Sequence, residues 1–455
     1  MTEATLRDRF GFWTRRLAGN STLRGVILIG GGAAAGQIIT VAATPIVSRL
    51  YGPPAYGALA VFTSILNMAS ILVTFRYEVA IPLPTEDEEA RDLLVLALAM
   101  ALVAAGLVCA GLLGWLAFAR PSQPNPLLRH LVWTLPLGML GAGGYQSFAY
   151  WATRKRLYRP ISATRLNQSV AAVGSQILLF RLPPQGLGLI LAAIVARAFG
   201  LRTLITAFWA SSPKTPWPSP ARLVALLRKY WSISAYGIAT AVATEIGDSL
   251  PSLLLARAFG LPAAGIYLMA SRIFALPSQM VGAAVSQVFM GECSHRLRED
   301  PRTVHDYFHS VHRNLRWVGG GVLLLGALSP LFLPWVLGAK WHAAGMVAAI
   351  LAPMAATDIT VRPLYNITVI ANRPRLQLVT GLVPMAFSVL GLGLPIFLGG
   401  SDTTALVSYS LSRCLGSGVI YLIYRSVARN LGSGEEGPGP GPLLPPLDTG
   451  GGMEP

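Results

Sequence analysis

Long apolar stretches, separated by short polar and charged gaps, dominate the pattern of this 455-residue chain. A helix needs about 20 mostly apolar residues to cross the hydrocarbon core of a membrane. Twelve runs reach this length, which predicts an all-α integral membrane protein with about twelve transmembrane helices. The predicted runs are residues 25–48, 57–82, 92–118, 128–151, 160–181, 186–209, 230–256, 262–290, 313–338, 343–371, 376–399 and 403–426.

A nine-residue motif lies between two of these runs and recurs later in the chain. Arg49-Leu-Tyr-Gly-Pro-Pro-Ala-Tyr-Gly57 is matched 208 residues on by Arg257-Ala-Phe-Gly-Leu-Pro-Ala-Ala-Gly265. Two more pairs keep the same order: residues 152–157 match 371–376, and 197–200 match 413–416. Internal repeats in an apolar chain are typical of transporters whose binding site lies between two halves. We therefore expect two six-helix bundles related by an axis along the membrane normal.

The repeat also predicts the domain organisation. A Pro-rich segment around residues 211–220 favours a semi-rigid, non-helical connection between the halves. Gly-Pro repeats from Leu431 onwards predict a disordered end. The predicted parts are a cytoplasmic N-terminal segment (1–24), a first lobe (25–210), a cytoplasmic linker (211–229), a second lobe (230–428) and a disordered cytoplasmic tail (429–455).

Composition agrees with a membrane protein and excludes an ordinary soluble one. The chain is 53% hydrophobic and only 12% charged, with a net charge of +16. The basic residues fall in short gaps between apolar runs, which indicates the positive-inside rule and not a nucleic-acid-binding face. Their distribution predicts that both termini are cytoplasmic. The acidic run 85–92 is also predicted to lie on the cytoplasmic side. We interpret it as the start of a helix because acidic residues stabilise helix N-termini.

No cofactor or metal site is predicted. Cys109, Cys293 and Cys414 lie far apart, so they indicate neither a disulfide framework nor a metal site. His305 and His309, with His312, lie at helical spacing on a basic stretch, but no carboxylate or thiolate completes a ligand set. We interpret them as a solvated face. The first 24 residues lack the apolar core and cleavage site of a cleavable signal peptide.

Ionisable side chains inside predicted membrane helices are candidates for function, because burying them in lipid is costly. Arg76 and Glu78 lie near the cytoplasmic end of their run, as Arg362 does, so snorkelling to the interface is an alternative. Arg76 and Glu78 are two residues apart, which puts them on different sides of a helix and predicts that they do not pair. The full set is Arg76, Glu78, Arg197, Glu245, Asp248, Arg272, Asp358, Arg362 and Arg413.

Arg197 and Arg413 are repeat-equivalent and near mid-membrane, so a shared role is expected unless each only orders its own lobe. Asp248 and Arg272 lie 12 residues before and after position 260, at one depth, which predicts an ion pair. The alternative is a structural staple without a ligand role.

Glu245 matches Gln37 at the 208-residue offset, and both are predicted to line a central cavity. The candidate substrate-binding residues are therefore Arg76, Arg272, Gln37, Glu245, Asp248, Arg197 and Arg413.

Several strings resemble the polysaccharide transporter (oligosaccharide flippase) family of the multidrug/oligosaccharidyl-lipid/polysaccharide exporter superfamily. They are the first motif copy, Phe75-Arg-Tyr-Glu-Val-Ala-Ile-Pro-Leu-Pro84 and Tyr150-Trp-Ala-Thr-Arg-Lys-Arg156, and the resemblance covers about residues 20–430. It implies a MATE-like, V-shaped pair of bundles in the cytoplasmic (inner) membrane. It also implies movement of undecaprenyl-pyrophosphate-linked oligosaccharide, with a polysaccharide polymerase and export machinery as further candidate partners.

Two other functions remain open. A cation-coupled multidrug or small-molecule exporter of the same fold would favour an acidic, aromatic cavity, whereas arginines at bilayer depth favour a pyrophosphate. A membrane polysaccharide polymerase or ligase needs external catalytic groups, yet the longest external loop, 119–127, has no carboxylate or histidine pair. We therefore expect a flippase, not an enzyme, whose partners are the lipid-linked oligosaccharide and the bilayer but no nucleic acid.

Overall fold

The computed structural model describes residues 21–119, 126–184, 186–371 and 373–433, and every regular element within them is a helix. This confirms the predicted all-α class. The long helices are α2 Ser21–Leu50, α3 Pro53–Val73, α4 Asp87–Ala119, α5 Pro126–Arg154, α6 Tyr158–Leu178, α7 Leu187–Ser211, α9 Trp231–Phe259, α10 Leu261–Glu299, α11 Thr303–Leu337, α12 His342–Val361, α14 Pro374–Phe397 and α15 Asp402–Ser433. The short ones are α8 Pro220–Lys229, α13 Asn366–Ile370 and the 3-10 turns η1 Tyr77–Ala80, η2 Ala339–Trp341 and η3 Arg362–Tyr365.

Each of the twelve predicted runs falls on one long helix, although η1 takes the end of 57–82, and 343–371 is divided among α12, η3 and α13. Within the described residues, eight helices are long and apolar enough to cross a membrane, or nine if the bent α10 is one span. The other three runs, α5, α6 and α9, are interrupted by more polar residues. The protein is a multi-pass membrane protein on these criteria.

The described residues form two compact units. The first contains the residues up to Met269 together with Leu331–Gly345, and the second contains Ala270–Pro330 together with the residues from Met346 onwards. The predicted lobe boundary at 211–229 stays a prediction. Residues 1–20 and 434–455, which hold most of the predicted N-terminal segment and tail, lie outside the described residues; α15 extends past the predicted lobe end at 428 to Ser433.

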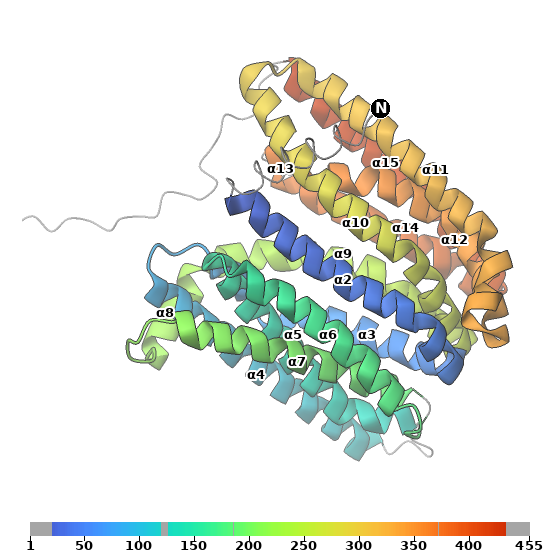
Figure 1. The fold of residues 1–455 in the computed structure, drawn as a ribbon, viewed down its shortest axis with the longest axis horizontal. Helices are drawn as coiled ribbons and strands as arrows, with labels where there is room; N and C mark the ends of the chain where they lie inside the picture. The colour runs from blue at the N-terminus through green and yellow to red at the C-terminus, as the bar shows by residue number, and fades with distance from the viewer. Residues whose placement is uncertain (1–20, 120–125, 185, 372, 434–455) are drawn as a thin grey trace, which may run out of the picture. The chain divides into compact units, whose positions relative to one another are not determined.

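In the first unit, α6 packs against α2 and α7, α5 packs against α4 and α7, and α3 contacts α5 and α9 (Figure 1). Small residues allow these close approaches, as is usual where lipid supplies no hydrophobic force between helices. A Cβ added to Gly143 of α5 would lie 2.6 Å from Val73 Cγ1 of α3. The α3–α5 contact therefore depends on the absence of a side chain at position 143.

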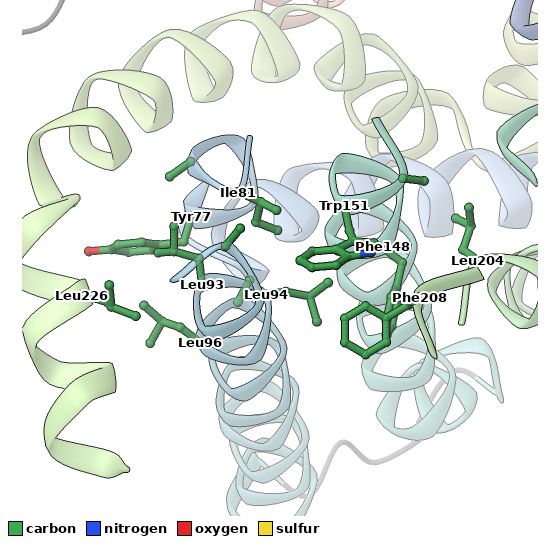
Figure 2. Packing of buried hydrophobic residues seen from close by; sticks show 14 of the residues in the cluster. Tyr77, Ile81, Leu93, Leu94, Leu96, Phe148, Trp151, Leu204, Phe208 and Leu226 are labelled. Carbon is green, nitrogen blue, oxygen red and sulfur yellow. The ribbon is translucent and has the colours of Figure 1, made fainter. Parts of the chain in front are cut away.

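One buried apolar cluster joins six elements of this unit at the end where α4 begins (Figure 2). The Phe208 ring of α7 meets the rings of Phe148 and Trp151 of α5 edge-on, with centroids 5.3 and 5.2 Å apart. Edge-to-face pairs of this kind add to the stabilisation that burial gives. The labelled members are Tyr77, Ile81, Leu93, Leu94, Leu96, Phe148, Trp151, Leu204, Phe208 and Leu226.

The two copies of the repeated motif lie directly against each other in the first unit. Each copy forms a turn between two helices, α2–α3 and α9–α10. A Cβ on Gly57 would lie 1.9 Å from the Leu261 carbonyl oxygen, and one on Gly265 would lie 2.0 Å from the Pro53 carbonyl oxygen. Because 53 and 261, like 57 and 265, are separated by 208 residues, the contact is reciprocal between repeat-equivalent positions. Gly260 adopts a φ of +85°, which glycine tolerates best.

A segment from much later in the chain covers this turn. The Trp341 indole N–H donates to the Ser48 carbonyl at 2.9 Å, and the Ser48 hydroxyl donates to the Leu337 carbonyl at 3.0 Å. The Tyr56 and Trp341 rings meet edge-on with centroids 5.1 Å apart. These contacts explain why Leu331–Gly345 belongs to the first unit.

The second unit is built around α14 and α15, which pack along each other, with α13 beside both. Its main apolar cluster joins α10, α11, the end of α12, η3, α13 and α15. The members that fill the centre, each with no exposed surface, are Phe289, Cys293, Val304, Phe308, Leu364, Ile367 and Ala428.

The segment 212–219 is not helical, as predicted, but α8 within the predicted linker was not anticipated. Ser219 caps α8 by accepting from the Arg222 N–H, and Pro220 stands in its first turn. Leu226 is buried in the apolar cluster, whereas Arg222 and Arg228 are exposed. The helix α8 is therefore amphipathic. A helix this short is only marginally stable by itself, so its packing against the apolar cluster stabilises it.

Candidate functional site

A break in the membrane helix α3 positions the first candidate site. The helix ends at Val73, after which Phe75 and Arg76 adopt left-handed φ values of 46° and 62° before η1 begins. Such values are uncommon for residues other than glycine and are tolerated only where the surroundings fix them. The Ser234 hydroxyl of α9 donates to the Phe75 carbonyl, and the Tyr77 hydroxyl donates to the Leu227 carbonyl at 2.8 Å.

Arg76 and Glu78 form an ion pair at this break. Arg76 Nη1 lies 3.8 Å from Glu78 Oε1; the Glu78 side chain is 1% exposed and that of Arg76 is 31% exposed. The prediction that these residues cannot pair was wrong, because it assumed a continuous helix where α3 has already ended. The Thr74 hydroxyl donates to Glu78 Oε2.

The Arg76–Glu78 pair is loose. A separation of 3.8 Å is too long for a hydrogen bond, and in the described part of the chain neither Arg76 Nε nor Glu78 Oε1 has a hydrogen-bond partner. The site thus contains the half-buried guanidinium of Arg76 next to the fully buried carboxylate of Glu78. The exposed side of the guanidinium is accessible to an anion.

The acidic run beyond η1 begins α4 and binds basic residues from two other segments, the end of α5 and α8. Asp87, Glu88 and Glu89 stand in the first turn of α4, which confirms their interpretation as a helix start. Asp87 pairs with Arg154 at 3.1 Å and also with Lys155, and Glu88 pairs with Arg222 at 3.0 Å. These contacts place the segments around 87, 154 and 222 at one end of the first unit.

Arg91 fixes the linker to the same end. Its guanidinium is 3% exposed and donates to the Thr215 carbonyl, the Thr215 hydroxyl and the Pro216 carbonyl at 2.7, 2.6 and 2.7 Å. Asp92, with no exposed surface, lies 2.9 Å from Arg91 and 2.6 Å from Arg222. Sequence reasoning did not identify Arg91 and Asp92, although two adjacent charges directly before an apolar run were a visible signal.

The repeat-equivalent Arg197 and Arg413 have different partners. Arg197 Nη1 donates along α7 to the Ala193 carbonyl at 2.9 Å. Arg413 is 3% exposed, and its Nη2 donates to Asp358 Oδ2 of α12 at 2.9 Å. Their expected shared role in substrate binding stays a prediction.

Asp358 of the second unit contacts three other polar side chains. Besides Arg413, it receives Arg362 Nη2 at 3.2 Å and the Ser417 hydroxyl at 2.7 Å. The sequence marked Asp358, Arg362 and Arg413 as candidates but did not predict that they meet. The spacing of Asp358 and Arg362, four residues apart, was the local sequence signal, and it indicated only the pair that these two residues form.

The remaining predicted residues are distributed over three helices. Glu245 of α9 is half-buried and accepts from the Ser249 hydroxyl at 2.6 Å, and Gln37 of α2 is also half-buried. Asp248 is exposed and belongs to the first unit, whereas Arg272 is half-buried and belongs to the second. The predicted Asp248–Arg272 ion pair stays a prediction.

The three histidines of α11 are half-buried, not solvated as expected. The His305 and His309 rings are 4.5 Å apart, and His312 stacks on Tyr421 of α15 at 4.3 Å. Tyr421 of α15 covers His312 and also stacks on Phe308 of the same helix, with centroids 5.9 Å apart. Among the described residues, no group of three histidine, cysteine or carboxylate side chains could hold a metal ion.

Solved structures with the same fold are membrane transporters of low sequence identity. The chain is similar to an inward-facing multidrug resistance MATE family transporter of the MOP superfamily, with a TM-score of 0.64, 14% identity and coverage of 90% of this chain and 96% of that one. It is also similar to a mutant of the Vibrio cholerae MATE transporter VcmN, with a TM-score of 0.56, 15% identity and coverage of 92% and 99%. At these identities the likeness establishes the fold, which is that of MATE transporters.

Sequence comparison supplies the family. No curated protein matches the chain. A family model described as polysaccharide biosynthesis protein matches residues 46–346, from the end of α2 to the first part of α12. This stretch includes both motif copies, the α3 break and the linker. The chain therefore belongs to the polysaccharide biosynthesis protein family.

Proposed function

We propose that this protein is a flippase, which moves undecaprenyl-pyrophosphate-linked oligosaccharide repeat units across the cytoplasmic membrane by alternating access. The product would supply synthesis of a polysaccharide such as O-antigen, capsule or exopolysaccharide. The observation that carries the proposal is a polysaccharide biosynthesis family model matching a chain with the fold of membrane transporters. No covalent step is part of it.

Charged side chains in or beside the membrane helices support an anionic substrate. A pyrophosphate loses its water shell on entering a low-dielectric path, and arginine replaces that water with planar, bidentate donors. Arg76 has the exposure needed, with 31% of its side chain accessible at the α3 break. We propose that Arg76 captures the head group and that Arg272 holds it farther along the path.

Glu78 gives Arg76 a resting partner. Its carboxylate balances the guanidinium when no anion is bound, but at 3.8 Å the contact is weak enough for a phosphate to compete. An uncompensated arginine in this buried setting would be costly. The loose pair therefore suits a group that binds and releases an anion in each cycle.

A cation-coupled exporter is the alternative, favoured by the solved structures described as multidrug transporters. In that case the half-buried Glu245 would bind the coupling ion or a cationic substrate. Cells with the protein would then tolerate cationic drugs better than cells without it, and lipid-linked precursor would not accumulate when the protein is lost.

The test measures polymer export and cytoplasmic accumulation of lipid-linked precursor in cells that carry the protein only as variants. Arg272→Ala and Arg76→Ala should each lower export, and Arg272→Lys should lower it less because the charge remains without the planar fork. Arg257→Ala, an exposed arginine in the second motif copy, is the control and should export normally. Unchanged export by both alanine variants at normal protein levels would contradict the cationic path, and unchanged export without the protein would contradict the flippase.

A further inference from the structure

The helix α11 passes from a basic segment into an apolar one at Trp317. The twenty residues 318–337 carry no charge, and this is about the length needed to cross the hydrocarbon core. A tryptophan stands near each end of the stretch: Trp317 directly precedes it and Trp335 is close to its end, and each side chain is 83% exposed. Tryptophan is enriched where hydrocarbon meets the lipid headgroups. This pattern places the membrane boundary of α11 at Trp317.

Two arginines lie within about one helical turn before Trp317. Arg313 and Arg316 are both exposed, as Trp317 is. Because position 313 is four residues before 317 and position 316 adjoins it, the three side chains emerge from neighbouring parts of the helix surface. At the end of a membrane helix, long basic side chains cover apolar surface with their stems and extend their charges to the headgroups.

The helix α15 brings a third arginine to the same end of α11. The Tyr421 ring of α15 stacks on the His312 ring, with centroids 4.3 Å apart. Arg425, one turn after Tyr421, is exposed and interacts electrostatically with His309. Arg316 interacts in the same way with His312. Since the two histidines are three residues apart on one helix, Arg425 belongs to the same basic group as the arginines of α11.

Positive charge exceeds negative charge in this basic group. It contains Arg313, Arg316 and Arg425, and in the part of the chain that the structure describes none of the three forms an ion pair. Asp306 is a carboxylate that also acts on His309. Three arginines and one carboxylate leave two positive charges. Basic residues at a membrane surface attract anionic lipids.

Beyond Trp317 the exposed side of α11 is apolar. Leu324 and Leu328 lie seven and eleven residues after Trp317, on the same side of the helix, and both are exposed. Along this side, guanidinium groups are therefore followed by an indole ring and then by leucines. A phospholipid has the same order of groups, with its phosphate, its glycerol esters and its acyl chains. An inorganic phosphate would contact only the guanidinium groups.

The structure assigns this surface, formed by Arg313, Arg316, Trp317 and Arg425, to an anionic phospholipid of the surrounding leaflet. The guanidinium groups bind oxygens of the lipid phosphate through their planar fork. The Trp317 ring lies at the level of the glycerol esters, and an acyl chain runs along the leucines. The assignment does not depend on the proposed transport, because a leaflet lipid binds whether or not a substrate moves.

Native mass spectrometry of the full chain in a phosphate-free maltoside detergent tests the site. Dioleoylphosphatidylglycerol is the anionic probe and dioleoylphosphatidylcholine the zwitterionic one. The double variant Arg313→Gln/Arg316→Gln should bind phosphatidylglycerol about tenfold more weakly and phosphatidylcholine equally well, because two attractive charges are lost. Arg298→Gln/Arg302→Gln is the matched control. It removes the same charge from exposed positions before α11 and should bind both probes as the unchanged protein does.

Two results of this titration would overturn the site. One is unchanged phosphatidylglycerol binding by Arg313→Gln/Arg316→Gln, and the other is an equal loss in the control variant, which would mean that any exposed arginine at this end is sufficient. Geranylgeranyl diphosphate is the third probe, because it also joins a phosphate group to an apolar chain. If the first double variant loses affinity for this probe but keeps its affinity for phosphatidylglycerol, the ligand is an isoprenoid diphosphate and the phospholipid assignment is wrong.

The position of Trp317 has a readout that does not depend on the arginines. In nanodiscs of phosphatidylglycerol brominated next to the glycerol esters, Trp317→Phe should remove part of the tryptophan emission that bromine quenches. Trp341→Phe replaces an indole with no exposed surface, so it is the control and should leave the quenched emission unchanged. Equal quenched emission in Trp317→Phe and the unchanged protein would overturn the placement of Trp317 at the membrane boundary.

Discussion

At the scale of single residues, the reciprocal contact of Gly57 and Gly265 is the tightest constraint in the first unit. A methyl group at either position would lie about 2 Å from a carbonyl oxygen of the other motif copy. Backbone cannot yield as a flexible side chain does, so overpacking here should cost about 1–3 kcal/mol. We expect Gly57→Ala and Gly265→Ala each to lower the thermal unfolding midpoint of the purified protein in detergent.

Gly111 of α4 is the matched control for the two alanine variants. It is also a glycine in a long helix, but a Cβ there would meet nothing within 4 Å. Alanine favours a helix over glycine, so Gly111→Ala should leave the midpoint unchanged or raise it. If Gly57→Ala and Gly111→Ala unfold at the same temperature, the close contact of the two motif copies is not present in the folded protein.

At the scale of elements, the linker 212–219 has no helix or strand of its own and depends on Arg91 for its position. Three of its acceptors are bonded to this one guanidinium. Hydrogen bonds to a charged group contribute about 1.5–3 kcal/mol each when buried. Arg91→Ala should therefore increase local opening of the linker, and trypsin should cleave after the exposed Lys214 faster than in the unchanged protein.

Arg228→Ala is the control for the linker experiment, because Arg228 is an exposed residue of the adjacent α8. Its removal should not change the rate of cleavage after Lys214. Equal cleavage rates in Arg91→Ala and Arg228→Ala would show that the linker is held by α8 and the apolar cluster without help from Arg91.

At the scale of the whole molecule, the orientation in the membrane follows from the basic loops. Residues 86, 157, 218, 300 and 373 all lie in breaks between helices. The ion pairs of Asp87 with Arg154 and of Glu88 with Arg222 bring three of these breaks to one end of the first unit. Reporter fusions after the five positions should all report the cytoplasm. An external signal from two or more would contradict the predicted topology.

The sequence by itself determined the class, the number of long helices and the position of the repeated turns. Insertion into lipid requires about 20 apolar residues in one helix, so the twelve runs could be recognised without knowledge of their neighbours. The motif turns could be recognised because glycine and proline act locally on the backbone. The start of α4 at the acidic run and the non-helical linker followed from equally local rules.

Only the tertiary structure decided which charged residues meet. Arg76 pairs with Glu78 because α3 ends at Val73, and the left-handed residues after it are fixed by a hydrogen bond from Ser234, 159 residues away. Asp358 and Arg413 are 55 residues apart, and α8 is held through Leu226 by a cluster drawn from five other elements. Hydropathy and spacing describe each segment alone. The energy of a buried charge depends instead on the partners that other segments bring to it.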